Sequence, residues 1–114
     1  MNLQIEQVGE GIKYLILEGR MDLAGTQAID HRFTAATATT AAPVVVDLAQ
    51  VSFLASIGIR TLLQSAKALK QRGGRMVLLN PSEQVEGVLR STGIADIIPI
   101  FRDLDSACAA ARGS

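Results

Sequence analysis

The spacing of apolar residues switches along the chain between the period of a strand and that of a helix. Residues 3–8 alternate polar and apolar side chains, which predicts an edge strand, and the nearly continuous apolar segment 12–17 predicts its buried hairpin partner. The β-branched segment 44–48 and the apolar segment 75–79 predict two central strands. Apolar residues recur at helical intervals from Ile59 to Leu69, and they predict a helix that starts directly after Ser56 and ends at Arg72-Gly73-Gly74. These three segments form a βαβ unit, whose two strands we expect to be parallel.

Three further helices and a short strand complete the predicted elements. A helix begins at Leu23 or Ala24, just after Asp22, whose carboxylate is suited to cap it. A second begins after residues 80–82. A short edge strand is expected over 97–101, because Pro99 has no N–H to donate to a sheet, and a last helix follows over residues 104–112.

The whole pattern predicts one α/β domain over residues 1–112. Its small mixed sheet has an N-terminal edge hairpin and parallel βαβ units, and about four helices cover it. No internal repeat or long linker divides the chain. Residues 113–114, Gly-Ser, resemble the remnant of a cloning tag.

Composition limits the partners that the chain is expected to bind. The 114 residues are 48% hydrophobic and 19% charged, and 11 basic residues balance 11 acidic ones. A net charge of zero gives no electrostatic reason to expect nucleic acid or an anionic membrane as a partner. The N-terminal segment lacks a secretory signal, no apolar stretch approaches the roughly 20 residues of a membrane-spanning helix, and Cys108 has no second cysteine. We therefore expect a cytoplasmic protein.

Residues for catalysis or metal binding are not grouped in the sequence. His31 lies among polar neighbours, and no cluster of His, Cys, Asp and Glu has metal-ligand spacing, so we expect neither a metal nor a cofactor. Asp22 and Asp47 suggest the acidic residues of a receiver domain, but that pattern is incomplete, because Asp47 lies inside the buried apolar segment and no suitable lysine follows. We expect Asp22 to cap a helix and Asp47 to be a hydrogen-bonding group at a strand end.

Ser56 stands at the start of the best-defined helix. Its hydroxyl is suited to accept a hydrogen bond from a free amide of the first turn, which makes an N-cap the simplest interpretation. An apolar segment, 51–55, leads into it, and Gly58 lies in the first turn. Glycine there costs up to about 1 kcal/mol relative to alanine, so it indicates close approach of either a partner or another part of the fold.

Several short motifs, spread over the whole chain, resemble those of the STAS domains, and among them the bacterial anti-sigma factor antagonists. One match is to the family's Gly-x-Leu-Asp after the second strand, a second to its central strand and the exit from it, and two to its later turns. In chain order these are Gly19-Arg20-Met21-Asp22, Val46-Asp47-Leu48 with Val51-Ser52-Phe53-Leu54, Gly73-Gly74, and Ser91-Thr92-Gly93-Ile94. Their combination is more specific than any one of them.

This resemblance implies a regulatory cycle centred on Ser56. In the family, the first hydroxyl of Asp-Ser-Ser-Gly or Asp-Ser-Thr-Gly is phosphorylated, and it corresponds to Ser56. The chain has Ala55 in place of the acid and Ile57 in place of the second hydroxyl. The implied partners are an anti-sigma factor that is also a serine kinase of the GHKL type, and a metal-dependent serine phosphatase of the PPM type. Phosphorylation ends binding of the anti-sigma factor, and the phosphatase restores it.

We expect the contact surface to combine the turn at Asp22, the loop before the helix and the exposed helix face. Burial is the alternative for Phe53 and Leu54, and we favour it for Phe53. The predicted contact residues are Asp22, Phe53, Leu54, Ala55, Ser56, Ile57, Gly58 and Arg60.

Two other functions remain open. A STAS subunit of a transport or signalling complex would use the same surface with Ser56 as a helix cap only. A small enzyme using Asp22 or Ser56 would need a catalytic base, and no such residue lies near Ser56 in the sequence. We therefore expect no catalytic activity.

Overall fold

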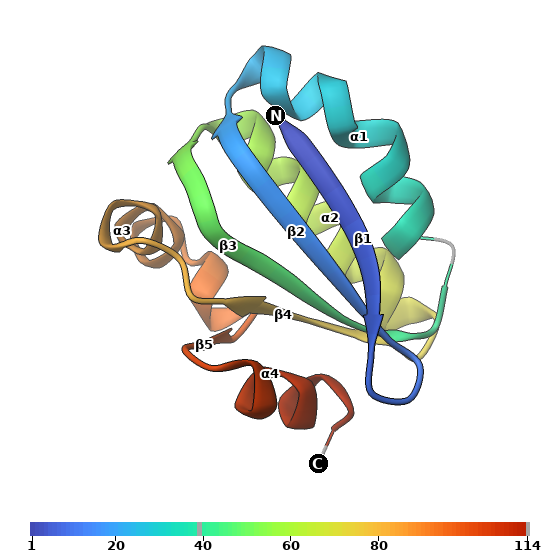
Figure 1. The fold of residues 1–114 in the computed structure, drawn as a ribbon. Helices are drawn as coiled ribbons and strands as arrows, with labels where there is room; N and C mark the ends of the chain where they lie inside the picture. Colours follow the sequence, from blue (N-terminus) through green and yellow to red (C-terminus); the bar gives the residue numbers. More distant parts are fainter. Residues whose placement is uncertain (39, 114) are drawn as a thin grey trace.

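A computed structural model describes residues 1–38 and 40–113 as one sheet with helices on both faces (Figure 1). Ser114, the second residue of the predicted tag remnant, lies outside the described residues. In chain order the elements are β1 (Asn2–Val8), β2 (Ile12–Met21), α1 (Leu23–Thr37), β3 (Pro43–Leu54), α2 (Ser56–Gln71), β4 (Arg75–Leu79), α3 (Glu83–Ser91), a 3-10 helix η1 (Ile94–Asp96), β5 (Ile100–Phe101) and α4 (Leu104–Ala111).

The five described strands lie in sequence order, β1-β2-β3-β4-β5. β1 and β2 are antiparallel and form the predicted edge hairpin, whereas β2, β3, β4 and β5 are mutually parallel. The predicted α/β class, mixed sheet and parallel βαβ unit are therefore confirmed. Parallel strands end at the same edge of a sheet, so the carboxyl ends of β2 and β3 lie together, next to the helices that follow them.

β3 is longer than its apolar pattern suggests. We expected a strand over 44–48 and a loop over 49–55, but the strand continues to Leu54 alongside an extended β2. Its register against β2 shifts twice. The first shift lies between the pairs Ile16–Asp47 and Glu18–Gln50, and the second lies just before the pair Arg20–Phe53. The shifts interrupt the strict alternation of inward-facing and outward-facing residues, so the sequence of the second half of β3 resembles that of a loop.

The end of the sheet also differs from the prediction. The expected strand over 97–101 is reduced to the two residues of β5, and the 3-10 helix η1 precedes it. Pro99 lies directly before β5, and its carbonyl accepts a hydrogen bond from the Leu78 N–H at 2.9 Å. Proline thus ends the ladder on its amino-terminal side, as expected from its missing donor.

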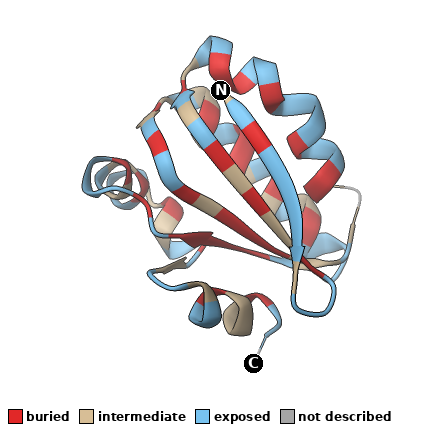
Figure 2. Cartoon of the chain, in the orientation of Figure 1, coloured by how far each residue is buried: buried red, intermediate tan, exposed pale blue. Residues whose placement is uncertain are grey.

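Two apolar cores lie on opposite faces of the sheet. The larger one joins the sheet to α1, α2 and α3, and includes the fully buried Phe33, Leu62 and Leu89. The smaller one lies under α4 and contains Ala107 and Ala111. Figure 2 shows buried residues along the central strands and exposed residues along most of β1. No helix of residues 1–38 or 40–113 is long and apolar enough to cross a membrane.

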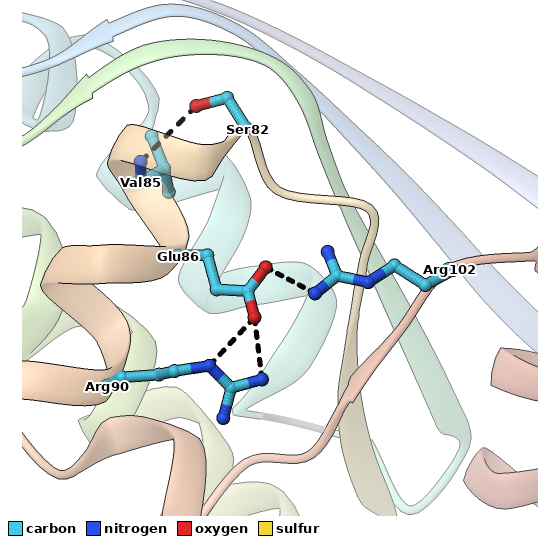
Figure 3. A network of polar contacts seen from close by, with 5 residues as sticks. All are labelled: Ser82, Val85, Glu86, Arg90 and Arg102. Carbon is cyan, nitrogen blue, oxygen red and sulfur yellow. Dashed lines mark hydrogen bonds and ion pairs between the residues drawn. The ribbon is translucent and has the colours of Figure 1, made fainter.

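An ion-pair network ties α3 to the segment after β5 (Figure 3). Glu86 accepts hydrogen bonds from Arg90, one turn later at 2.7 Å, and from Arg102. Both guanidinium groups hold the pKa of Glu86 below its usual range, with Arg102 the larger influence. Ser82 caps the same helix by accepting from the Val85 N–H at 3.3 Å. These contacts fix the start of α3 and hold the helix against the segment after β5.

Candidate functional site

The amino-terminal ends of α1 and α2 meet where β2 and β3 end. Met21 and Leu54 form the last residue pair between β2 and β3. Immediately beyond it, the Ala55 N–H donates to the Met21 carbonyl at 3.0 Å. Asp22 and Ser56, the residues that follow, are therefore held side by side on two paired strands. The strands form a rigid base for the start of each helix.

Two glycines allow this close approach. A methyl group at Gly58 would lie 2.7 Å from Met21 Cγ and 2.8 Å from Leu54 Cδ1, both nearer than carbon atoms can pack. A methyl group at Gly25 would lie only 1.9 Å from the Arg20 carbonyl oxygen. Gly58 is buried, so packing of α2 on the end of the sheet explains it, and approach of a partner does not.

Ser56 is exposed and is the first residue of α2. The prediction that it caps the helix is wrong, because the cap position belongs to Ala55, whose side chain makes no capping hydrogen bond. The helix begins one residue earlier than the polar side chain suggested. Within the described residues no hydrogen bond engages the Ser56 hydroxyl, which leaves its oxygen open to solvent.

Asp22 caps the start of α1 and lies at one side of the site. Its carboxylate accepts from the Gly25 N–H at 2.8 Å, which confirms the predicted helix cap. That backbone hydrogen bond is the main reason why the pKa of Asp22 lies below its usual value, with Arg20 adding to the effect. Arg20 is 3.3 Å from the Asp22 carboxylate and lies over the Phe53 ring, 4.4 Å from its centre. These contacts link the ends of β2 and β3 at the surface.

The predicted contact residues separate into a surface and its support. Ser56 and Arg60 are exposed, and Asp22, Phe53, Ala55 and Ile57 are half-buried. Leu54 and Gly58, in contrast, are buried beneath them. Favouring burial of Phe53 over Leu54 was wrong, because the second register shift turns Leu54 into the core and leaves the Phe53 ring under Arg20.

Sequence reasoning missed two residues beside this surface. Leu23, the first residue of α1, is 59% exposed, although leucine normally favours the interior. Its position directly after the cap, outside the apolar stripe of its helix, was the available signal. Arg20 was missed because only the register with Phe53 brings its guanidinium to the site.

Asp47 lies elsewhere on the sheet and does not complete an acidic pair with Asp22. It accepts hydrogen bonds from the Tyr14 hydroxyl and, at 2.9 Å, from the Ala49 N–H, so it is a hydrogen-bonding group within β3 and not at its end. Burial, followed by the bond to Asp47, raises the pKa of Tyr14. Among the described residues no three His, Cys, Asp or Glu side chains are grouped as metal ligands.

Comparison with known proteins identifies the family. The family model for the STAS domain matches residues 4–107. A Bordetella bronchiseptica protein named "Putative anti-sigma factor antagonist BtrV" is 27% identical over 110 residues, covering 96% of this chain and 94% of the relative. The anti-sigma F factor antagonist of Paenibacillus polymyxa is 27% identical over 103 residues, covering 89% of this chain and 88% of the relative.

Solved structures give the same assignment at the level of the fold. The anti-sigma factor antagonist SpoIIAA in its unphosphorylated form superimposes with a TM-score of 0.79 and 24% identity, covering 99% of this chain and 98% of the other. The phosphorylated Bacillus SpoIIAA gives a TM-score of 0.72 and 22% identity, with 96% and 97% covered. The match to the family model covers β1 from Gln4 onward and all of β2, β3, β4 and β5, and the chain belongs to the STAS domain family.

Proposed function

We propose that this chain is an anti-sigma factor antagonist that binds its partner through the surface around Ser56, and that phosphorylation of Ser56 ends the binding. The observation that carries the proposal is the exposed Ser56 hydroxyl, free of hydrogen bonds within the described residues and held at the end of a rigid sheet. The names of full-length relatives support the function. The role is regulatory binding and not catalysis.

The docking surface, called the Ser56 surface below, comprises six side chains on two adjacent segments. Its three apolar side chains are half-buried, and two charged side chains lie beside them, as at the centre and rim of protein interfaces. Leu54 and Gly58 support the surface from below and make no direct contact with the partner. Its members are Asp22, Phe53, Ala55, Ser56, Ile57 and Arg60.

The switch requires a kinase and a phosphatase. In the phosphorylation step the Ser56 oxygen bonds to the γ-phosphorus of ATP, the bond to ADP breaks, and the hydroxyl proton passes to a base of the kinase. We infer that the anti-sigma factor supplies this kinase as a protein of the GHKL type, and that a phosphatase of the PPM type hydrolyses the ester with water. Both reactions, and the module itself, are assigned to the cytoplasm.

Local physics allows the modification without unfolding. A phosphoryl group adds about −1.5 to −2 charges at pH 7. At the first residue of α2 that charge lies near the positive end of the helix dipole, and the first turn holds no acidic residue to repel it. The same charge within a docked interface is desolvated and repels acidic groups of the partner. Binding therefore changes while the domain, assigned to residues 1–112, stays folded.

The proposal is tested with the anti-sigma factor kinases encoded in the same genome, each purified and mixed with this chain and ATP. We expect phosphate transfer to the native chain and none to Ser56→Ala. Ser56→Glu is expected to bind at least about tenfold more weakly, since one misplaced charge at an interface costs more than 1.4 kcal/mol. Ser52→Ala, at an exposed serine of β3, is the matched control. Persistent labelling of Ser56→Ala would overturn the assignment.

A second function follows from the two residues that flank Ser56. Ala55 supplies no acid and Ile57 no second hydroxyl, unlike the family's usual motif. A STAS subunit that binds constitutively within a transport or signalling complex needs neither group. Equal partner affinity of the native chain and Ser56→Glu would favour this function over the switch.

A further inference from the structure

One arginine belongs to the Ser56 surface and another lies over its Phe53 ring, and the two differ in whether they are already engaged. Arg20 is 3.3 Å from the Asp22 carboxylate and stacks on the Phe53 ring at 4.4 Å. Arg60 is exposed, and within the described residues it makes no ion pair, side-chain hydrogen bond or stacking contact. Arg60 is therefore the cation of the Ser56 surface that remains available to a new anion.

Helix geometry directs Arg60 toward Ser56. The two residues are four positions apart in α2, so they lie on the same helix face about one turn apart, with Cβ atoms about 5–6 Å from each other. Long side chains in a helix lean toward its amino terminus, which points the guanidinium from Arg60 back over the first turn. The first turn of α2 contains no acidic residue that would compete for it, and the Asp22 carboxylate beside Ser56 is already engaged by the Gly25 N–H and by Arg20.

We propose that phosphoserine at position 56 captures Arg60 in an internal ion pair. This inference rests on the proposed function, because it concerns the phosphorylated form of that site. In the unmodified chain the exposed guanidinium of Arg60 binds an acidic group of the partner. In the modified chain the phosphate oxygens accept from its guanidinium, a planar donor suited to phosphate. Phosphorylation then adds an anion to the Ser56 surface and withdraws its free cation in one step.

Phosphate at position 56 can prevent docking in two ways, by repelling the partner alone or by also capturing Arg60. Repulsion alone would leave Arg60 unchanged, so removing Arg60 would not alter the properties of the phosphate. Capture makes the dianionic phosphate more stable beside Arg60, which lowers the second pKa of the phosphoserine. The phosphate pKa is therefore a direct readout of the ion pair, and it is measured without any partner.

The experiment uses full-length chain with phosphoserine placed at position 56 during translation, titrated by phosphorus NMR. We expect the phosphate pKa of the native chain to lie about 0.3 pH unit or more below that of Arg60→Gln, the size typical of a pair one helix turn apart. Lys67→Gln removes another exposed cation of α2, about two turns further on, and is expected to leave the pKa unchanged. The difference should shrink in 1 M salt.

Equal phosphate pKa values in the native chain and Arg60→Gln would overturn the capture. A fall caused equally by Lys67→Gln would also overturn it, since the effect would then be the general field of the domain. Because the phosphoserine is installed without a kinase, this result is independent of whether the cellular kinase modifies Ser56. Failure of kinase labelling would instead count against the proposed function.

Discussion

Replacing Gly25 by alanine tests whether the start of α1 is packed directly on the end of β2. The added methyl carbon would lie 1.9 Å from the Arg20 carbonyl oxygen and 3.1 Å from the Asp22 carboxylate. The first contact is with backbone, so no side-chain rotation relieves it. Either the helix or the strand end must shift, and the shift displaces Asp22 from the site.

The magnitude follows from two opposing effects. Overpacking a well-packed region costs about 1–3 kcal/mol, and a clash between backbone atoms belongs at the upper end of that range. Alanine is a better helix former than glycine by up to about 1 kcal/mol, which offsets part of the cost. We expect Gly25→Ala to lower the free energy of unfolding by about 2 kcal/mol, or the melting temperature by about 8 °C for a domain of this size.

Urea unfolding followed by circular dichroism measures this loss. Gly87→Ala is the matched control, because Gly87 lies within α3 and a methyl group there meets no atom within 4 Å. Its helix propensity gain should stabilise the domain by up to about 1 kcal/mol. If Gly25→Ala were as stable as Gly87→Ala, the close packing of α1 on β2, and with it the geometry of the site, would be refuted.

Three other outcomes are expected. Leu23→Ala should weaken binding of the anti-sigma factor about fivefold or more, because the exposed Leu23 borders the Ser56 surface directly after Asp22 and is expected to add an apolar contact at its rim. Ile97→Ala, at an equally exposed residue, should leave the titrated affinity unchanged. The pKa of Asp22 is lower in the folded chain than in the unfolded chain, so ionised Asp22 stabilises the fold fully above its unfolded pKa, and this stabilisation is lost as the pH falls through the folded pKa. Asp22→Asn should therefore reduce the dependence of the unfolding free energy on pH in acid, and an unchanged dependence would contradict this. Tyr14→Phe removes a hydrogen-bond donor to Asp47 and should lower the free energy of unfolding, measured in urea, by about 1 kcal/mol. An unchanged free energy of unfolding would show that this hydrogen bond does not stabilise the fold.

The sequence was sufficient for the elements whose apolar pattern is regular. The alternation in 3–8 marks β1, and the helical stripe from Ile59 to Leu69 with the glycines after it marks α2, each within a few residues of its observed ends. β2 begins where expected but continues to Met21, beyond the predicted segment 12–17. Asp22 was also assigned correctly as a cap, because its position before an apolar stripe has a local cause. These features depend on neighbouring residues only.

The errors concern features that depend on pairing between distant strands. The orientation of Phe53 and Leu54 follows from a register shift of β3 against β2, and a shift of one residue exchanges the two faces of a strand. Arg20 reaches the Ser56 surface for the same reason. In the sequence, Gly58 is consistent with close approach of a partner or of another part of the fold, and only its contact with the Met21 side chain distinguishes the two. None of these contacts has a signal in the local sequence.

The central claim is that a charge on the Ser56 oxygen alters docking and leaves the fold intact. It is tested most directly by installing phosphoserine at position 56 and measuring two quantities on the same sample, the free energy of unfolding and the affinity for the anti-sigma factor. We predict an unfolding free energy within about 1 kcal/mol of the unmodified chain, as expected for an exposed charge at a helix start, and an affinity at least about tenfold lower. An unchanged affinity, or a domain that unfolds on modification, would contradict the account.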